Sequence, residues 1–170
     1  MPLCRPVYRH RSRQRELLGV GMPSVYPVEW VPATFRGNYR HMAKRDAAVW
    51  ERFLVTYTER FDAFAYDVAL GGIVLGGIPM EEHERQGWQY STALKIDAIG
   101  RTGDAYWIIE VRPDATVSAL GSALTYALVC ERDEVVPGPL LPTVVCEYIQ
   151  PDVRWACGKL GVQIVTVPSG

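Results

Sequence analysis

Long apolar runs are missing from this 170-residue sequence. No stretch approaches the roughly 20 apolar residues that a membrane-spanning helix needs, so we expect no membrane partner. Arginines occupy the N-terminal region where a secretory signal peptide has its apolar segment, which disfavours secretion. Cysteines are few and far apart, and no two form a CxxC pair: Cys4, Cys130, Cys146 and Cys157. These absences favour a cytoplasmic protein with reduced thiols.

The motifs of three common enzyme classes are also missing. The histidines are distant from one another, and no two have the spacing of metal ligands: His10, His41 and His83. The glycine-rich stretch LGGIVLGG lacks a following GK[ST], so it is not a phosphate-binding P-loop. No GxSxG motif occurs, and serine hydrolase chemistry is therefore unsupported.

Charge is distributed unevenly along the chain, although the net charge is only −1. Residues 1–45 contain nine Lys or Arg and two acids, a net charge of +7. Residues 46–170 contain nine basic and 17 acidic residues, a net charge of −8. Basic segments of this kind commonly contact phosphate backbones or acidic protein surfaces.

The basic segment lacks helical or strand periodicity and contains five prolines, at positions 2, 6, 23, 27 and 32. We therefore expect residues 1–43 to form a docking arm and residues 44–170 to form one α/β domain. DNA and an acidic protein surface are both open as its partner. The candidate contacts are the basic residues of this region: Arg5, Arg9, Arg11, Arg13, Arg15, Arg36, Arg40, Lys44 and Arg45.

From Lys44 onward, hydrophobic periodicity predicts alternating helices and strands. Asp46 marks the start of the first helix. A glycine-rich loop over 70–79 and a polar connection over 80–89 separate the first strand from a hairpin. The expected strands are 64–70, 94–102, 105–112, 143–149 and 162–167, with helices after positions 44, 113 and 151. The third strand, the following helix and the fourth strand form a βαβ unit, which predicts a mixed sheet flanked by helices.

The hairpin KIDAIGRTGDAYWIIEVRP concentrates charge on one face. If Gly103-Asp104 is a two-residue turn, Asp97 lies opposite Glu110 and Lys95 lies opposite Arg112. A four-residue loop over 100–103 would offset the acids instead, and a solvated face whose acids are neutralised by the bases is the alternative interpretation. The other face is apolar and predicts the core side: Leu94, Ile96, Ala98, Ala105, Trp107, Ile109 and Val111.

Directly opposed carboxylates repel each other, so the predicted register needs a compensating charge. Mg²⁺ is suited to this position, because it takes oxygen ligands from one or two carboxylates and fills its other positions with water or phosphate. Lys95 and Arg112 would then stabilise negative charge at phosphorus or orient an attacking water.

Asp97, followed after twelve residues by Glu110-Val111-Arg112, resembles the D…(D/E)xK signature of the PD-(D/E)XK nuclease superfamily. The resemblance extends over residues 44–167 and implies an αβββαβ core, here with an additional C-terminal α-β. It implies Mg²⁺- or Mn²⁺-dependent hydrolysis of DNA phosphodiesters, with Asp97, Glu110 and the Val111 carbonyl as metal ligands. A further acid on the leading helix is expected, with Glu51 as first choice and Glu59 as second.

Two positions depart from this signature. Arg112 replaces the lysine and cannot lose its proton, and Ser122 stands where a glutamine is frequent. Lys95 is a candidate for supplying the missing ammonium. The departures leave a second interpretation open, a nuclease fold that has lost its chemistry.

The chain also looks like small stand-alone nuclease-like proteins of the head and tail gene module of tailed bacteriophages. The stretches PVEW, FRGNYRH, FDAFAYDVALGG and YIQPDVRWACGKLGVQIVTV carry this resemblance. It implies a location in the host cytoplasm or in the virion, and it implies other phage structural proteins or further copies of the chain as partners. The alternative to an enzyme is then a structural component of the head-to-tail neck or connector.

Overall fold

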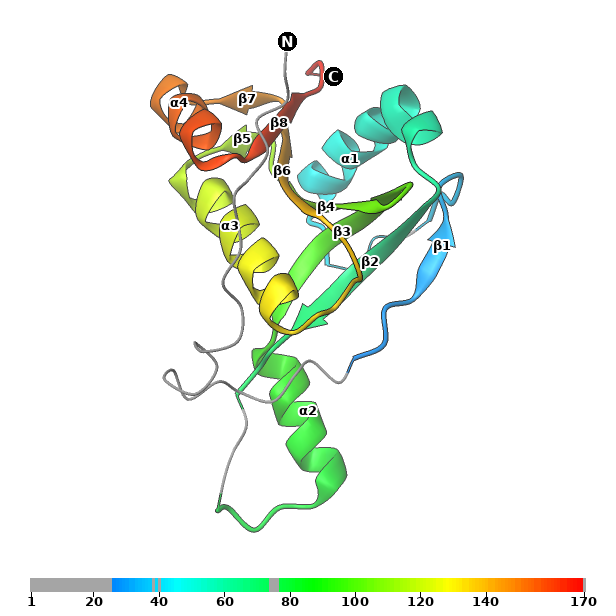
Figure 1. Ribbon diagram of the computed structural model, residues 1–170, viewed down its shortest axis with the longest axis vertical. Helices are drawn as coiled ribbons and strands as arrows, with labels where there is room; N and C mark the ends of the chain where they lie inside the picture. Colours follow the sequence, from blue (N-terminus) through cyan, green and yellow to red (C-terminus); the bar gives the residue numbers. More distant parts are fainter. Residues whose placement is uncertain (1–25, 38, 40, 74–76, 170) are drawn as a thin grey trace.

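The computed structural model describes residues 26–37, 39, 41–73 and 77–169. Within them a mixed six-stranded sheet is flanked by helices, as predicted (Figure 1). Helix α1 covers one face of the sheet and α3 the other. The elements are β1 (Trp30–Pro32), α1 (Lys44–Tyr57), a 3₁₀ turn η1 (Thr58–Arg60), β2 (Ala63–Leu70), α2 (Glu82–Thr92), β3 (Leu94–Thr102), β4 (Ala105–Val111), β5 (Asp114–Ala115), α3 (Val117–Arg132), β6 (Leu140–Cys146), β7 (Tyr148–Ile149), α4 (Pro151–Leu160) and β8 (Gln163–Thr166).

The main sheet has the strand order β1-β2-β3-β4-β6-β8. Strands β1 to β4 are antiparallel neighbours, whereas β4, β6 and β8 are parallel. The predicted parallel pairing across the βαβ unit β4-α3-β6 is confirmed. The short strands β5 and β7 form a separate parallel pair beside it.

The end of the expected docking arm belongs to the sheet. Strand β1 pairs with β2, with Val31 opposite Phe64, and the following Ala33 and Tyr39 are buried in the core under α1. This segment therefore packs on its own domain, because its apolar side chains extend the core. Residues 1–25, with the first five arginines of the arm, lie outside the described residues.

The predicted polar connection over 80–89 is wrong, because residues 82–92 form helix α2. Glu81 and Glu84 form a capping box at its N-terminus, an interaction that satisfies exposed backbone N–H groups. Only Gln89 of this helix is buried, so the helix has no apolar stripe that periodicity would reveal. Figure 1 shows α2 projecting beyond the end of the sheet.

The predicted hairpin turn is confirmed. Gly103 has a φ of 55°, and Thr102 lies opposite Ala105 with Ile99 opposite Ile108. Both faces of the hairpin are buried: Ile109 packs in the core under α1, and Ile108 packs in the core on the side of α3. Side chains in the middle of the hairpin are thus shielded from water whichever face of the sheet they point to.

Gly100 is expected to tolerate no side chain. A Cβ at this buried β3 position would lie 2.6 Å from Phe61 and 2.9 Å from Phe64, whose rings are fixed by mutual packing. Gly100→Ala is therefore expected to lower the free energy of unfolding by about 1–3 kcal/mol. Urea denaturation measures this, with Gly158→Ala as control, since its Cβ in α4 would meet nothing within 4 Å. Equal stability of the two variants would contradict the packing argument.

Candidate functional site

Asp97 and Glu110 lie where β3 and β4 begin to separate. The ladder runs from Thr102–Ala105 to Ala98–Ile109, one position short of the two acids. Beyond that position the Val111 N–H donates to Asp97 Oδ2 over 2.8 Å. The Asp97 carboxylate therefore accepts the hydrogen bond that a backbone carbonyl of β3 would accept if the ladder continued. This bond holds the Asp97 side chain against β4, the strand that carries Glu110.

The Arg112 guanidinium is the centre of the acidic cluster. Its Nη2 lies 2.7 Å from Glu110 Oε1, and its Nη1 lies 3.6 Å from Asp97 Oδ2. Nη1 also donates to the Val111 carbonyl over 2.8 Å and to Asp46 Oδ2 over 3.2 Å. Arg112 thus contacts each of the three groups predicted as metal ligands from the hairpin, and adds an acid from α1.

That acid is Asp46 and neither of the expected glutamates. Glu51 and Glu59 are exposed, whereas the Asp46 side chain is 13 % exposed and paired with Arg112. Helical spacing contains the missed signal, because Asp46 precedes the buried Val49 and Trp50 by three and four residues and therefore lies on the same helix face. From the sequence, Asp46 was expected only to mark the start of the helix.

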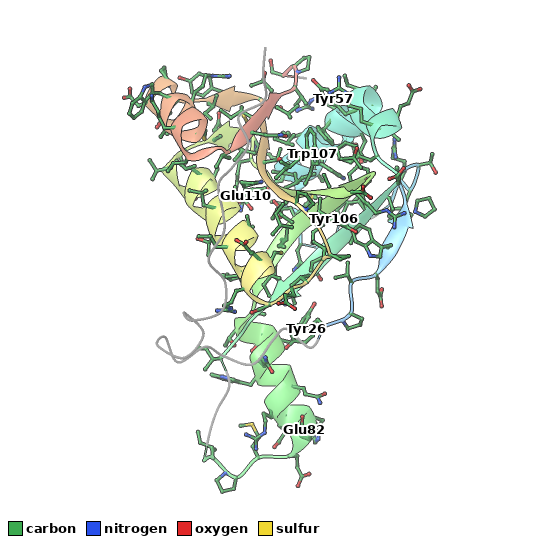
Figure 2. The ribbon with its side chains drawn as sticks, in the orientation of Figure 1. Tyr26, Tyr57, Glu82, Tyr106, Trp107 and Glu110 are labelled. Carbon is green, nitrogen blue, oxygen red and sulfur yellow. The ribbon has the colours of Figure 1, made fainter. Side chains whose placement is uncertain are left out.

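Glu110 is the most buried acid of the cluster, with 1 % of its side chain exposed. Figure 2 shows it between the sheet and α3. This burial excludes the alternative of a solvated charged face. Arg112 Nη2 and the Ser122 hydroxyl both lie close to it, but neither meets it in hydrogen-bond geometry, and both carboxylate oxygens lack a hydrogen-bond partner within the described part of the chain.

The cluster contains more acidic groups than cationic groups, and burial raises the pKa values of two of its carboxyls. Burial and, to a smaller extent, the neighbouring Asp97 raise the pKa of Glu110 to about 8, against the opposing charge of Arg112. Burial raises the pKa of Asp97 to about 6, against the hydrogen bond from Val111 and the charge of Arg112. One guanidinium faces three carboxylates, and two negative charges stay uncompensated whenever all three are ionised.

Lys95 does not join this cluster. Its Nζ donates to the Tyr90 carbonyl over 2.9 Å and lies 3.2 Å from the centroid of the Tyr90 ring. Burial lowers the pKa of Lys95, and the nearby Asp67 opposes this. The expected pairing of Lys95 across from Arg112 is therefore not formed, and the ammonium lies beside α2.

The expected DNA- or partner-binding residues are described only in part. Arg36 donates to the Ala33 and Phe35 carbonyls and to Thr58 Oγ1, so it connects its own loop to η1. Arg45 forms an exposed ion pair with Asp114 over 3.3 Å, and Lys44 is exposed. The remaining candidates lie outside the described residues: Arg5, Arg9, Arg11, Arg13, Arg15 and Arg40.

No family model, no curated protein and no solved structure matches this chain. Within residues 26–37, 39, 41–73 and 77–169, no group of three or more His, Cys, Asp or Glu side chains is placed to hold a metal ion. None of the helices in the same ranges has the length and apolar character required to cross a bilayer.

Proposed function

We propose that this chain hydrolyses DNA phosphodiester bonds with the help of Mg²⁺ or Mn²⁺. The observation that carries the proposal is Glu110, a buried carboxylate next to a second buried carboxylate, Asp97. Among the described residues neither Glu110 oxygen has a hydrogen-bond partner, and Arg112 is the cation that pairs with it. A buried charge of this kind is costly unless a cation compensates it. The likeness of Asp97…Glu110-Val111-Arg112 to the PD-(D/E)XK signature supports the same reaction.

The residues present fit a hard divalent cation. Mg²⁺ needs only one or two carboxylates from the protein and keeps several waters, which Asp97, Glu110 and the Val111 carbonyl would satisfy. A cation bound there would lower the pKa of a coordinated water and neutralise charge on the phosphate. Binding requires Arg112 to leave these oxygens, and its side chain is 37 % exposed, so the guanidinium already borders solvent.

Arg112 has a role once it has left the carboxylates. Its planar guanidinium keeps its charge and presents paired N–H donors that match two oxygens of a phosphate. On this proposal the guanidinium pairs with Asp97 and Glu110 when no cation is bound, and it donates to a non-bridging oxygen of the substrate phosphate when the cation is bound. The excess of basic residues over positions 1–45 supports a polyanionic substrate such as DNA.

A plasmid cleavage assay tests the proposal. The wild type is expected to nick or linearise plasmid with Mg²⁺ or Mn²⁺ and to lose this activity in excess chelator. Glu110→Ala is expected to lose cleavage, whereas the matched control Glu51→Ala is expected to retain it, because Glu51 is exposed and stands apart from the ion pairs of Arg112. No cleavage by the wild type, or equal cleavage by Glu110→Ala, would end the enzymatic proposal.

A second candidate function rests on Arg112 itself. Because the guanidinium contacts Asp97, Glu110 and the Val111 carbonyl together, it is also suited to replace the metal permanently. The chain would then be a catalytically lapsed nuclease fold that serves as a structural component of a phage neck or connector and docks through its N-terminal arm. Inactive protein that is recovered in purified virions would support this candidate, and a monomer absent from virions would contradict it.

A further inference from the structure

A histidine–aspartate pair lies beside the acidic cluster. Asp67 occupies the middle of β2, and the pairs Tyr66–Ala98 and Val68–Ile96 place it across from Asp97 on β3. Its φ of 52° is in the left-handed region, which residues other than glycine adopt only occasionally. Residues held in such a conformation concentrate at functional sites, where the surrounding structure maintains the strain.

The Asp67 carboxylate orients His41. His41 Nε2 lies 2.8 Å from Asp67 Oδ2, and the Tyr90 hydroxyl donates to the same oxygen over 3.1 Å. An ionised carboxylate only accepts hydrogen bonds, so in the neutral imidazole the proton resides on Nε2 and the lone pair on Nδ1. The side chain of His41 is 43 % exposed, which leaves the imidazole accessible from solvent.

Within the acidic cluster, the Asp46 carboxylate pairs with Arg112 and the other two carboxylates, Asp97 and Glu110, are the proposed ligands of the cation. Arg112 cannot lose its proton, and the Lys95 ammonium is held by Tyr90. The β2–β3 register places Asp67, which binds His41, across from Asp97. Burial raises the pKa of Asp97, and a protonated His41 is among the groups that oppose this shift. Asp67 binds the imidazole, accepts a hydrogen bond from the Tyr90 hydroxyl and lies near Lys95.

We propose that His41 is the general base of the hydrolysis and that Asp67 is its positioning residue, an inference that rests on the proposed function. The water oxygen forms a bond to phosphorus while its proton moves to Nδ1 of His41. The phosphorus–oxygen ester bond breaks, its electron pair stays on the departing oxygen, and that oxygen takes a proton from solvent. His41 then returns its proton to bulk water, and Asp67 stabilises the imidazolium in between.

Cleavage kinetics test the role of His41. His41→Ala is expected to lower kcat by about 10²–10³-fold with little change in KM, and added imidazole is expected to restore part of the rate. The matched control His83→Ala removes an exposed histidine of α2 and is expected to leave kcat unchanged. Asp67→Asn is expected to lower kcat without imidazole rescue, because the imidazole is present but is no longer held in the required tautomer.

The outcomes separate this inference from the proposed function. If the wild type cleaves and Glu110→Ala does not, an unchanged kcat in His41→Ala overturns the role of His41 alone. No cleavage by the wild type overturns both. A readout without turnover is the ¹⁵N chemical shifts of the imidazole in the wild type and in Asp67→Asn. The Nε2-protonated tautomer is expected in the wild type and a mixture in the variant, and an Nδ1-protonated wild type would overturn the inference.

Discussion

Arg112→Ala is expected to lower the free energy of unfolding at pH 8 by about 3 kcal/mol, the lower end of the range for breaking a buried ion pair. The substitution leaves Asp46, Asp97 and Glu110 without their shared cation. The lower end applies because the guanidinium is partly exposed. Water can therefore enter the space that Arg112→Ala leaves and hydrate part of the uncompensated carboxylates. The loss is expected to shrink at pH 5, where Glu110, with a pKa of about 8, is protonated and needs no partner.

Urea denaturation at both pH values measures this effect. The control is Arg45→Ala, which breaks an ion pair with Asp114 whose two side chains are 76 % and 63 % exposed, and its loss is expected to stay below about 1 kcal/mol. A loss in Arg112→Ala no larger than that of the control would show that the guanidinium does not stabilise the buried acids.

The same variant distinguishes the two candidate functions. If the guanidinium and the cation use the same oxygens, Arg112→Ala is expected to bind Mn²⁺ more tightly than the wild type, and Mn²⁺ is expected to restore its stability by mass action. Calorimetric titration with Mn²⁺ alone measures both affinities. Unchanged or absent binding in the variant would contradict a metal site under Arg112 and would favour the lapsed fold.

Glu110→Gln is expected to remove most of the loss of stability that the wild type undergoes as the pH rises. The folded-state pKa of Glu110, about 8, lies above the value near 4.3 of an unfolded glutamate. Between these two pH values the folded state binds more protons than the unfolded state, so the free energy of unfolding falls with rising pH. The fall attributable to Glu110 is on the order of 3 kcal/mol between pH 5 and pH 8.

Equilibrium unfolding of the two proteins across this pH range measures the difference between their slopes. Asp97, whose pKa is raised to about 6, contributes a smaller fall in the same direction that the variant retains. The variant is also expected to lose Mn²⁺ binding, because an amide oxygen carries no charge to offset the desolvation of the cation. Identical slopes in wild type and variant would show that Glu110 is ionised in the folded protein throughout this range.

Local sequence signals were sufficient for the hairpin and for the βαβ unit. The dipeptide Gly103-Asp104 sets a two-residue turn, and a two-residue turn sets the register of both strands, so the proximity of Asp97 and Glu110 followed from a count along the chain. The parallel pairing of β4 with β6 followed from the length and apolar character of the intervening helix. These features depend on residues that are neighbours in sequence.

Local sequence signals were insufficient wherever hydrogen bonds or ring contacts, and not apolar packing, decided the structure. Lys95 was expected across from Arg112, but the strands separate beyond Ala98 and Ile109, and Tyr90 offers both a carbonyl and a ring nearby. Helix α2 was missed because its polar residues rely on a capping box instead of an apolar face. In both cases local hydrogen bonds determined the structure, and hydrophobic periodicity contains no information about them.

By itself the sequence determined the hairpin register from the turn to the pair Ala98–Ile109, since backbone geometry alternates side chains with a fixed period. Only the tertiary structure decided their environment. Packing of α3 over β4 buries Glu110, the first turn of α1 brings in Asp46, and Arg112 lies among all of the acids. The pairing of Arg112 with Asp46 joins residues that are 66 positions apart. The energies of these contacts depend on burial and charge at short range, which arise only when the helices close over the sheet.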